Sequence, residues 1–274
     1  MLINGKPETS VSADDRGIQY GDGLFETLAV RDGRPCLWHY HLERLHNGCQ
    51  RLNIPLPNES LLYDELIREI GEQSQGVVKV IVTRGPGGRG YRPPQESSAT
   101  RIIRWSESPN YPEANYQQGI VTRLCSTRLG WNPALAGIKH LNRLEQVLAR
   151  SEWSDPSIQE GLMMDSSGYV VEGTMSNLFV VQNGRLMTPD LSRCGVAGIM
   201  QGVVLRVAEA LAIPVIVDNV TLHDLWNADA LFVTNSLIGL WPVRELSGQA
   251  FDVSVIPREL ISRVMLQAYA HALS

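Results

Sequence analysis

The strongest signal in the sequence is the stretch Ala136-Gly-Ile-Lys139-His-Leu-Asn-Arg-Leu-Glu-Gln-Val147. The apolar residues Leu144, Val147 and Leu148 recur there at helical spacing, which predicts an amphipathic helix with this face turned toward the core. Lys139 comes just before that helix and lies outside its apolar face. Burial or cationic neighbours can lower the pKa of such a lysine and allow it to form a Schiff base. Position alone does not distinguish it from a solvated lysine, which is the commoner case.

The composition is that of an ordinary globular protein. The chain has 274 residues, 43% hydrophobic and 19% charged, with a net charge of -5, and this length suffices for one large domain or two moderate ones. No basic run indicates a nucleic-acid binder, and no apolar run or signal-like N-terminus indicates a membrane or export. The four cysteines are scattered, which is typical of a reducing compartment. We therefore expect a cytoplasmic protein that acts on a small molecule and binds neither nucleic acid nor membrane.

Residues 1–107 predict a small N-terminal α/β domain. Asn4-Gly5 and Asp32-Gly33 are turn signals that follow apolar runs. One helix is expected to stop before Pro55, and Asn58 is a good N-cap for the next. The elements expected here are strands over 1–3, 25–30, 77–83 and 101–105 and helices over 39–52 and 58–70.

Residues 108–116 are rich in proline and asparagine without periodicity, which indicates a linker. A larger domain is expected over residues 117–274. Two α+β domains with a cleft between them are the natural interpretation, because clefts between domains favour ligand binding. The elements expected in the larger domain are strands over 120–124, 161–164, 169–171, 178–181 and 231–234 and helices over 199–212, 222–227 and 257–272.

A glycine-rich run, Gly85-Pro-Gly-Gly-Arg-Gly90, follows one of the expected strands. A dinucleotide fingerprint has to open a helix, whereas this run continues into Tyr91-Arg-Pro-Pro94. We interpret it instead as a loop that directs Arg84, Arg89 and Tyr91 at an anionic group. A plain flexible connection explains the run equally well.

Two other classes of site find no support. His39 and His41 are two residues apart, so they lie on different faces of a helix, and neither has an acidic or cysteine partner at ligand spacing. No Gly-x-Ser-x-Gly sequence indicates a serine nucleophile. Neither a metal nor a serine hydrolase is predicted.

Separated segments carry groups that suit a phosphate-bearing cofactor. Glu172 lies between two strands and could pair with a protonated ring nitrogen. A glycine precedes a helix whose first backbone N–H groups, at Ile199 and Met200, can bind phosphate. Ser236 ends a strand, and Arg44 could add a charge-assisted contact. Each has an ordinary structural explanation alone, but a lysine, a carboxylate and a phosphate cup are together what pyridoxal phosphate requires.

In this order the residues resemble the fold-type IV pyridoxal-phosphate enzymes, which include branched-chain and D-amino-acid aminotransferases and the aminodeoxychorismate lyases. The resemblance covers nearly the whole chain and is closest to the lyases. It implies a homodimer of a two-domain α+β chain, with a barrel-like sheet in the larger domain and the cofactor in the cleft. The segments that carry it are Tyr20-Gly-Asp-Gly23, Arg84-Gly-Pro-Gly-Gly-Arg-Gly-Tyr91 and the residues from Arg128 to Val147.

The resemblance implies a role for each candidate. Lys139 becomes the Schiff-base lysine and Glu172 the partner of the pyridine nitrogen. Asn177 is the candidate partner of the cofactor hydroxyl, because Leu144 stands where aminotransferases often have a tyrosine. The implied phosphate ligands are Arg44, the backbone at Ile199 and Met200, and Ser236.

The implied activity is a carbon–oxygen lyase of folate biosynthesis that converts 4-amino-4-deoxychorismate into p-aminobenzoate and pyruvate. Lys139 is then the general base, and Arg84, Arg89 and Tyr91 are candidates for binding a substrate carboxylate. The alternative is an aminotransferase of D-amino or branched-chain amino acids on the same scaffold. A third interpretation is a phosphate-binding protein without catalysis.

Overall fold

The structure is a computed structural model that describes residues 1–270, and the chain divides into two compact units. Among the described residues, unit 1 comprises 1–109, 138–142 and 269–270, and unit 2 comprises 110–137 and 143–268. The sequence placed Lys139 in the C-terminal domain, whereas its contacts place it in unit 1. The physical reason is a backbone pairing, since the Phe25 amide donates to the Lys139 carbonyl at 3.0 Å.

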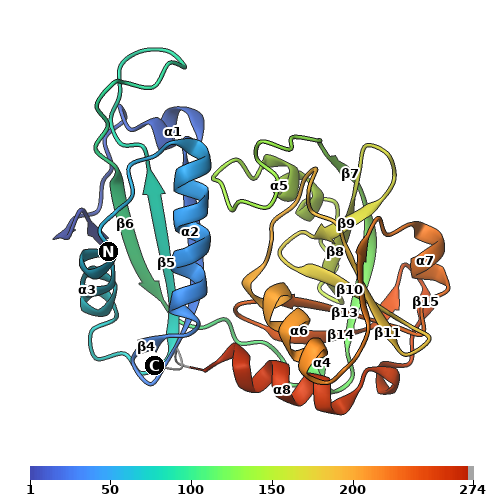
Figure 1. The fold of residues 1–274 in the computed structure, drawn as a ribbon. Helices are drawn as coiled ribbons and strands as arrows, with labels where there is room; N and C mark the ends of the chain where they lie inside the picture. The colour runs from blue at the N-terminus through green and yellow to red at the C-terminus, as the bar shows by residue number, and fades with distance from the viewer. Residues whose placement is uncertain (271–274) are drawn as a thin grey trace. The chain divides into compact units, whose positions relative to one another are not determined.

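Unit 1 is built on a six-stranded antiparallel sheet in the order β2-β1-β6-β5-β3-β4 (Figure 1). Both expected hairpin turns are confirmed: φ is 49° and 77° at Asn4 and Gly5, and 48° and 72° at Asp32 and Gly33. Two successive positive φ angles are the signature of the turn that matches strand twist. The strands are β1 Leu2–Ile3, β2 Lys6–Pro7, β3 Gly23–Arg31, β4 Arg34–Pro35, β5 Gly76–Thr83 and β6 Thr100–Ser106.

The helices of unit 1 are α1 Arg16–Tyr20, α2 Trp38–Leu52 and α3 Glu59–Ile70. Helix α2 buries Leu42 and Leu45 and packs on β3. The approach is close at Gly48, where an added Cβ would lie 2.8 Å from the Leu24 side chain. Asn58 caps α3 as expected, because its side chain accepts from the amide of Leu61. Strand β3 is therefore covered by the helix that carries Arg44.

Unit 2 contains a nine-stranded mixed sheet whose main path is β12-β11-β10-β13-β14-β7-β8-β9, with β15 paired to β14. Strand β9 ends this order yet contacts β10 and β11 near the other end, so the sheet curls on itself around an apolar core. The strands are β7 Ile120–Leu129, β8 Ile158–Asp165, β9 Val170–Gly173, β10 Asn177–Gln182, β11 Arg185–Pro189, β12 Val215–Asp218, β13 Ala230–Asn235, β14 Gly239–Leu246 and β15 Gln249–Ala250.

Strand β14 was not predicted from the sequence. It contains Pro242, and a proline inside an apolar run lowers the expectation of a strand because it cannot donate to the ladder. Pro242 is nevertheless paired with Phe232 in the register of β13 and β14. The strands β11, β12 and β15 were also missed, and each is five residues or fewer.

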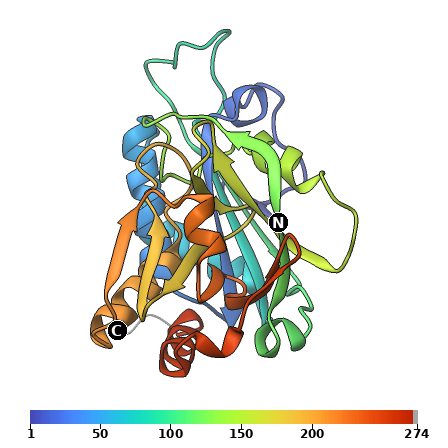
Figure 2. The ribbon, with the colours of Figure 1, turned by 90° about the vertical axis from the view of Figure 1, so that its right-hand side faces the viewer.

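The helices of unit 2 include α6 and α8, which lie side by side in both views (Figure 1, Figure 2). The predicted C-terminal helix ends at Ala268, and positions 271 and 272 of that prediction lie outside the described residues. Within residues 1–270, no helix is long and apolar enough to span a membrane. The helices are α4 Ala114–Gln117, α5 Leu144–Arg150, α6 Ile199–Ala210, α7 Leu222–Trp226, the 3-10 helix Val253–Val255 and α8 Arg258–Ala268.

The expected orientation of α5 is wrong. Leu144, Val147 and Leu148 are 76%, 57% and 60% exposed, and the buried residue of this helix is Ala149. The helix also begins five residues after Lys139 rather than beside it. Residues 138–142 belong instead to unit 1. The helical spacing of apolar residues therefore did not predict how this stretch packs.

Candidate active site

Lys139 lies on an extended segment that pairs with β3. The amide of Phe25 donates to the Lys139 carbonyl, and the amide of Leu141 donates to the carbonyl of Gly23, each at 3.0 Å. The Lys139 Nζ atom lies 4.4 Å from the centroid of the Phe25 ring, a distance at which a cation is attracted by an aromatic face. A strand rather than a helix therefore fixes the backbone of this amine.

A buried cluster of three side chains lies on β3 and α2. Glu26 accepts from Arg44 twice, from Nε at 2.8 Å and from Nη2 at 2.5 Å. His41 Nδ1 lies 2.6 Å from Glu26 Oε2. Glu26 and His41 are 2% and 1% exposed, and the Arg44 side chain is 12% exposed. The predicted phosphate ligand Arg44 is thus held by a carboxylate that the sequence analysis did not single out.

The charges in this cluster follow from its contacts. Burial raises the pKa of Glu26, but the charge and hydrogen bonds of Arg44 and the hydrogen bond from His41 outweigh it and lower the pKa to about 2. Burial lowers the pKa of His41 below its usual range, although the contact with Glu26 opposes the shift. At neutral pH Glu26 is a carboxylate and His41 is a neutral ring. Because a carboxylate only accepts, the ring proton is on Nδ1.

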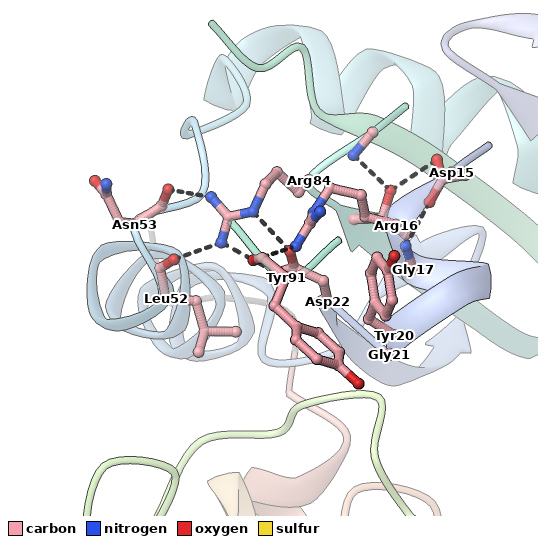
Figure 3. Close-up of polar contacts among 12 residues, drawn as sticks. Asp15, Arg16, Gly17, Tyr20, Gly21, Asp22, Leu52, Asn53, Arg84 and Tyr91 are labelled. Atoms are coloured by element: carbon pink, nitrogen blue, oxygen red, sulfur yellow. Dashed lines mark hydrogen bonds and ion pairs between the residues drawn. The ribbon is translucent and has the colours of Figure 1, made fainter. Parts of the chain in front are cut away.

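Arg84 points at Asp22 and at the end of α2, which does not fit its predicted role in substrate binding (Figure 3). It is 5% exposed. It donates from Nε and Nη2 to the carboxylate of Asp22, at 2.7 and 3.0 Å, and from Nη1 and Nη2 to the carbonyls of Asn53 and Leu52, at 2.6 and 2.7 Å. These carbonyls belong to the C-terminal end of α2. Arg84 therefore ties this helix end to Asp22 and has a structural role.

A second arginine holds the glycine-rich loop from the other side of Asp22. Arg16 donates to Asp22 at 2.9 Å and to the carbonyls of Gly90 and Tyr91 at 2.8 and 3.0 Å. The Tyr91 side chain is 85% exposed and makes an edge contact with the ring of Tyr20 (Figure 3).

The loop between β5 and β6 extends beyond the strands and does not start a helix, as expected (Figure 1). Its residue Arg89 is exposed. The roles predicted for Arg89 and Tyr91 in substrate binding stay predictions.

In unit 2, Glu172 is a buried carboxylate at the end of β9. It is 4% exposed, and its Oε2 accepts from the amide of Val196 at 2.8 Å while Oε1 accepts from Gln146 Nε2 at 3.3 Å. Gly195, with a φ of 86°, lets the loop come this close, since an added Cβ would lie 3.3 Å from Oε2. The structure thus holds this carboxylate against the loop of residues 194–198.

That loop leads directly into α6. Gly198 is the N-cap and offers no side chain to the first amides, which include those of Ile199 and Met200. Asn177 supports the loop, because its Nδ2 donates to the carbonyl of Val196 at 2.8 Å. An added Cβ on Gly198 would lie 1.8 Å from Asn177 Oδ1, so only glycine fits here. A helix start with amides not capped by a side chain is suited to an anion.

Ser236 follows the end of β13 in the same unit. Thr234 is the cross-strand neighbour of Asn177, and Ser236 stands two residues later in a turn. Asn235 Oδ1 fixes that turn by accepting from the amides of Leu237 and Ile238 at 2.9 and 3.0 Å. Glu172, Asn177 and the start of α6 therefore surround one loop, and Ser236 follows the strand paired with that of Asn177.

Glu26 and His41 are the site residues that the sequence analysis missed. A signal was present in the strand. Leu24, Glu26 and Leu28 are spaced two residues apart, so they share one face of β3, and all three are buried. An acid at an inward-facing position of an apolar strand is rare unless it is paired. On α2, His41 likewise shares the buried face of Leu42.

Comparisons with known proteins agree with this architecture. The family model for amino-transferase class IV matches residues 23–246. An aminodeoxychorismate lyase of Vibrio harveyi is 36% identical, with 89% of this chain and 90% of the relative covered. A putative branched-chain-amino-acid aminotransferase of Methanocaldococcus jannaschii is 33% identical, with 92% and 89% covered.

A solved structure, the 4-amino-4-deoxychorismate lyase from Pseudomonas aeruginosa, superposes with a TM-score of 0.91 at 49% identity, and 97% of both chains is covered. The predicted α+β fold with a barrel-like sheet is confirmed by this likeness and by the curled sheet of unit 2. The chain belongs to the class IV aminotransferase family.

Proposed function

We propose that the protein is a pyridoxal-phosphate-dependent lyase that converts 4-amino-4-deoxychorismate into p-aminobenzoate and pyruvate. The observation that carries this proposal is the near-full-length likeness to the lyase from Pseudomonas aeruginosa. The residues support it independently of that likeness, because a lysine on a fixed segment, a buried carboxylate and an open helix start are all present.

The groups on the chain fit the parts of pyridoxal phosphate. The carboxylate of Glu172 is buried and held by Val196 and Gln146, which suits a protonated pyridine nitrogen. The glycine at the start of α6 leaves its first amides to a phosphate. The phosphate ligands that we propose are Arg44, the amides of Ile199 and Met200, and the hydroxyl of Ser236.

Pyridoxal phosphate, when bound, supplies an aldehyde for the amine of Lys139 and a ring that accepts electrons from the neighbouring carbon. The residues of the chain hold or transfer protons. With the cofactor bound, Glu172 would keep a proton on the ring nitrogen, Asn177 would contact the cofactor hydroxyl, and Lys139 Nζ would take the proton from C4 of the substrate ring. The ammonium of Lys139 is also our candidate for protonating the enolpyruvyl oxygen as its bond to the ring breaks. Arg89 and Tyr91 are our candidates for binding a substrate carboxylate.

A direct assay tests the proposal. Purified protein with pyridoxal phosphate is given 4-amino-4-deoxychorismate, and p-aminobenzoate is measured by fluorescence and pyruvate by coupled reduction. D-alanine with 2-oxoglutarate is the competing assay for an aminotransferase. We expect turnover of the first substrate. Turnover of the second pair alone would reject the lyase assignment and favour the aminotransferase.

We also propose a homodimer in the cytoplasm. Leu144, Val147 and Leu148 form an exposed apolar surface on α5, and such surfaces are commonly covered by another chain. Sedimentation should give twice the chain mass of 30.4 kDa, and Leu148→Glu should lower that mass. The four cysteines are free and buried, which suits a reducing compartment. A wild-type monomer at micromolar concentration would contradict the dimer.

A further inference from the structure

We propose that Glu26 and His41 are positioning residues that orient the guanidinium of Arg44 toward the cofactor phosphate. This inference rests on the proposed function, since it takes Arg44 as a phosphate ligand. It assigns a function to a buried carboxylate and a buried imidazole that the lyase chemistry does not otherwise use.

The first step is the geometry of the ion pair. The two oxygens of Glu26 accept from Nε and Nη2 of Arg44, so the carboxylate and the guanidinium form a two-point contact along one edge. A bidentate contact fixes the plane of the guanidinium as well as its position. The opposite side, which carries Nη1, is thereby directed away from Glu26.

The second step is the hydrogen bond from His41. Its Nδ1–H donates to the same oxygen, Oε2, that accepts from Arg44 Nη2. Glu26 has almost no exposure to water, so protein donors have to satisfy its charge. His41 adds a donor without adding a charge, because burial keeps the ring neutral. It therefore holds Glu26 in the rotamer that meets Arg44.

The third step is the position of Glu26 in the strand. The preceding residue, Phe25, donates its amide to the carbonyl of Lys139. Phe25 thus fixes the backbone of Lys139, whose amine binds the cofactor aldehyde. The next residue, Glu26, fixes the guanidinium of Arg44, which binds the phosphate. Strand β3 is paired with β5 from Gly23 to Val30, so the spacing of these groups is set by a rigid element.

Charge and orientation predict opposite results when Glu26 is replaced. Glu26→Gln removes a negative charge beside Arg44, which by electrostatics alone would strengthen the binding of a phosphate. Loss of the bidentate contact frees the guanidinium to rotate, which weakens that binding. The direction of the change therefore decides between the two effects.

The experiment measures dissociation constants of the full-length protein, freed of cofactor, for pyridoxal phosphate and for pyridoxal, which lacks the phosphate. For Glu26→Gln we expect affinity for pyridoxal phosphate to fall on the order of 10-fold, the lower end of the loss seen when a partner that orients a metal ligand is removed. Affinity for pyridoxal should be unchanged, because pyridoxal lacks the phosphate that Arg44 binds. Tighter binding of pyridoxal phosphate, or an equal loss for both compounds, would overturn the inference.

A matched control is present in the same unit. Glu65, which is 3% exposed, accepts from Arg101 at 2.9 and 2.7 Å and so forms another buried bidentate pair. Glu65→Gln should destabilise the fold without changing the ratio of the two affinities. If it changes the ratio as much as Glu26→Gln does, the effect comes from general loosening and the inference fails.

Two further variants separate positioning from folding. His41→Asn keeps an N–H donor and should restore much of the ratio lost in His41→Leu. In an Arg44→Ala background, Glu26→Gln should have no further effect on the ratio. Wild-type protein that binds neither compound would instead reject the proposed function itself.

Discussion

Two carboxylates at one end of β3 show how the same kind of ion pair can serve different purposes. Asp22 precedes the strand and Glu26 lies four residues later, and each binds arginine through both oxygens. Around Asp22, the nitrogens of Arg84 and Arg16 also donate to backbone carbonyls. Around Glu26, the second donor is a neutral histidine that supports the carboxylate itself.

The difference lies in what the two arginines do with these contacts. Arg84 donates from all three nitrogens to groups of unit 1, so its bonds stabilise the fold of a loop and a helix end. Glu26 accepts from the Nε and Nη2 edge of the Arg44 guanidinium and thereby sets the direction of Nη1. Arg84 is therefore a structural residue, whereas the bidentate contact with buried Glu26 fixes the plane of the Arg44 guanidinium.

The largest effect is expected for the amine beside β3. Lys139→Ala should remove the yellow chromophore and lower turnover by roughly 100- to 10,000-fold, the range for loss of a general base. Lys79→Ala is a matched control, because Lys79 also lies over the Phe25 ring, at 4.8 Å. The control should keep both the chromophore and turnover. A Lys139→Ala protein with full activity would contradict the proposed site.

The next largest effect distinguishes the roles of Asp22 and Glu26. Asp22→Asn should lower the free energy of unfolding by about 3–5 kcal/mol, because it leaves the nearly buried Arg16 and Arg84 without their counter-charge. Glu26→Gln should cost less stability, because it leaves one arginine and a neutral ring. The order should reverse for the ratio of pyridoxal phosphate to pyridoxal affinity. Urea unfolding measures the first quantity and cofactor titration the second, and the same order in both assays would show that the two carboxylates have the same role.

Much of this region could be predicted from sequence because its signals are local. The turn at Asp32-Gly33, the strand before it and the helix with Leu42 and Leu45 follow from short-range patterns. The identity of Lys139 as a candidate came from its segment and from the family resemblance. Local patterns were sufficient for these elements because neighbouring residues determine them.

The rest depended on pairing between distant segments. The strand-like pairing of residues 138–142 with β3 joins positions more than a hundred residues apart, and no periodicity reports it. The apolar face of α5 has the expected spacing but is exposed, since spacing does not reveal what covers a face. Arg84 was mistaken for a ligand residue because the carbonyls of Leu52 and Asn53 are invisible in a sequence.

A smaller effect is expected in the pH dependence of stability. The folded-state pKa of Glu26 is lowered from its ordinary 4.5 to about 2. A depressed carboxyl pKa contributes stability that is fully present above the unfolded value and is lost as pH falls toward the folded one. Wild type should therefore lose part of its advantage over Glu26→Gln between pH 4.5 and about 2. Urea midpoints across this range measure it, and a constant difference would contradict the ionised pair.

The smallest effect is expected at Ser236, which contributes no charge to the proposed phosphate site. Ser236→Ala removes a single neutral donor, so affinity for pyridoxal phosphate should fall by about 1 kcal/mol, or roughly fivefold. Affinity for pyridoxal should be unchanged. If the hydroxyl contacts the phosphate separately from Arg44, the effects of Ser236→Ala and Glu26→Gln should add. A Ser236→Ala effect that disappears in Glu26→Gln would show instead that the phosphate shifts as soon as Arg44 is released.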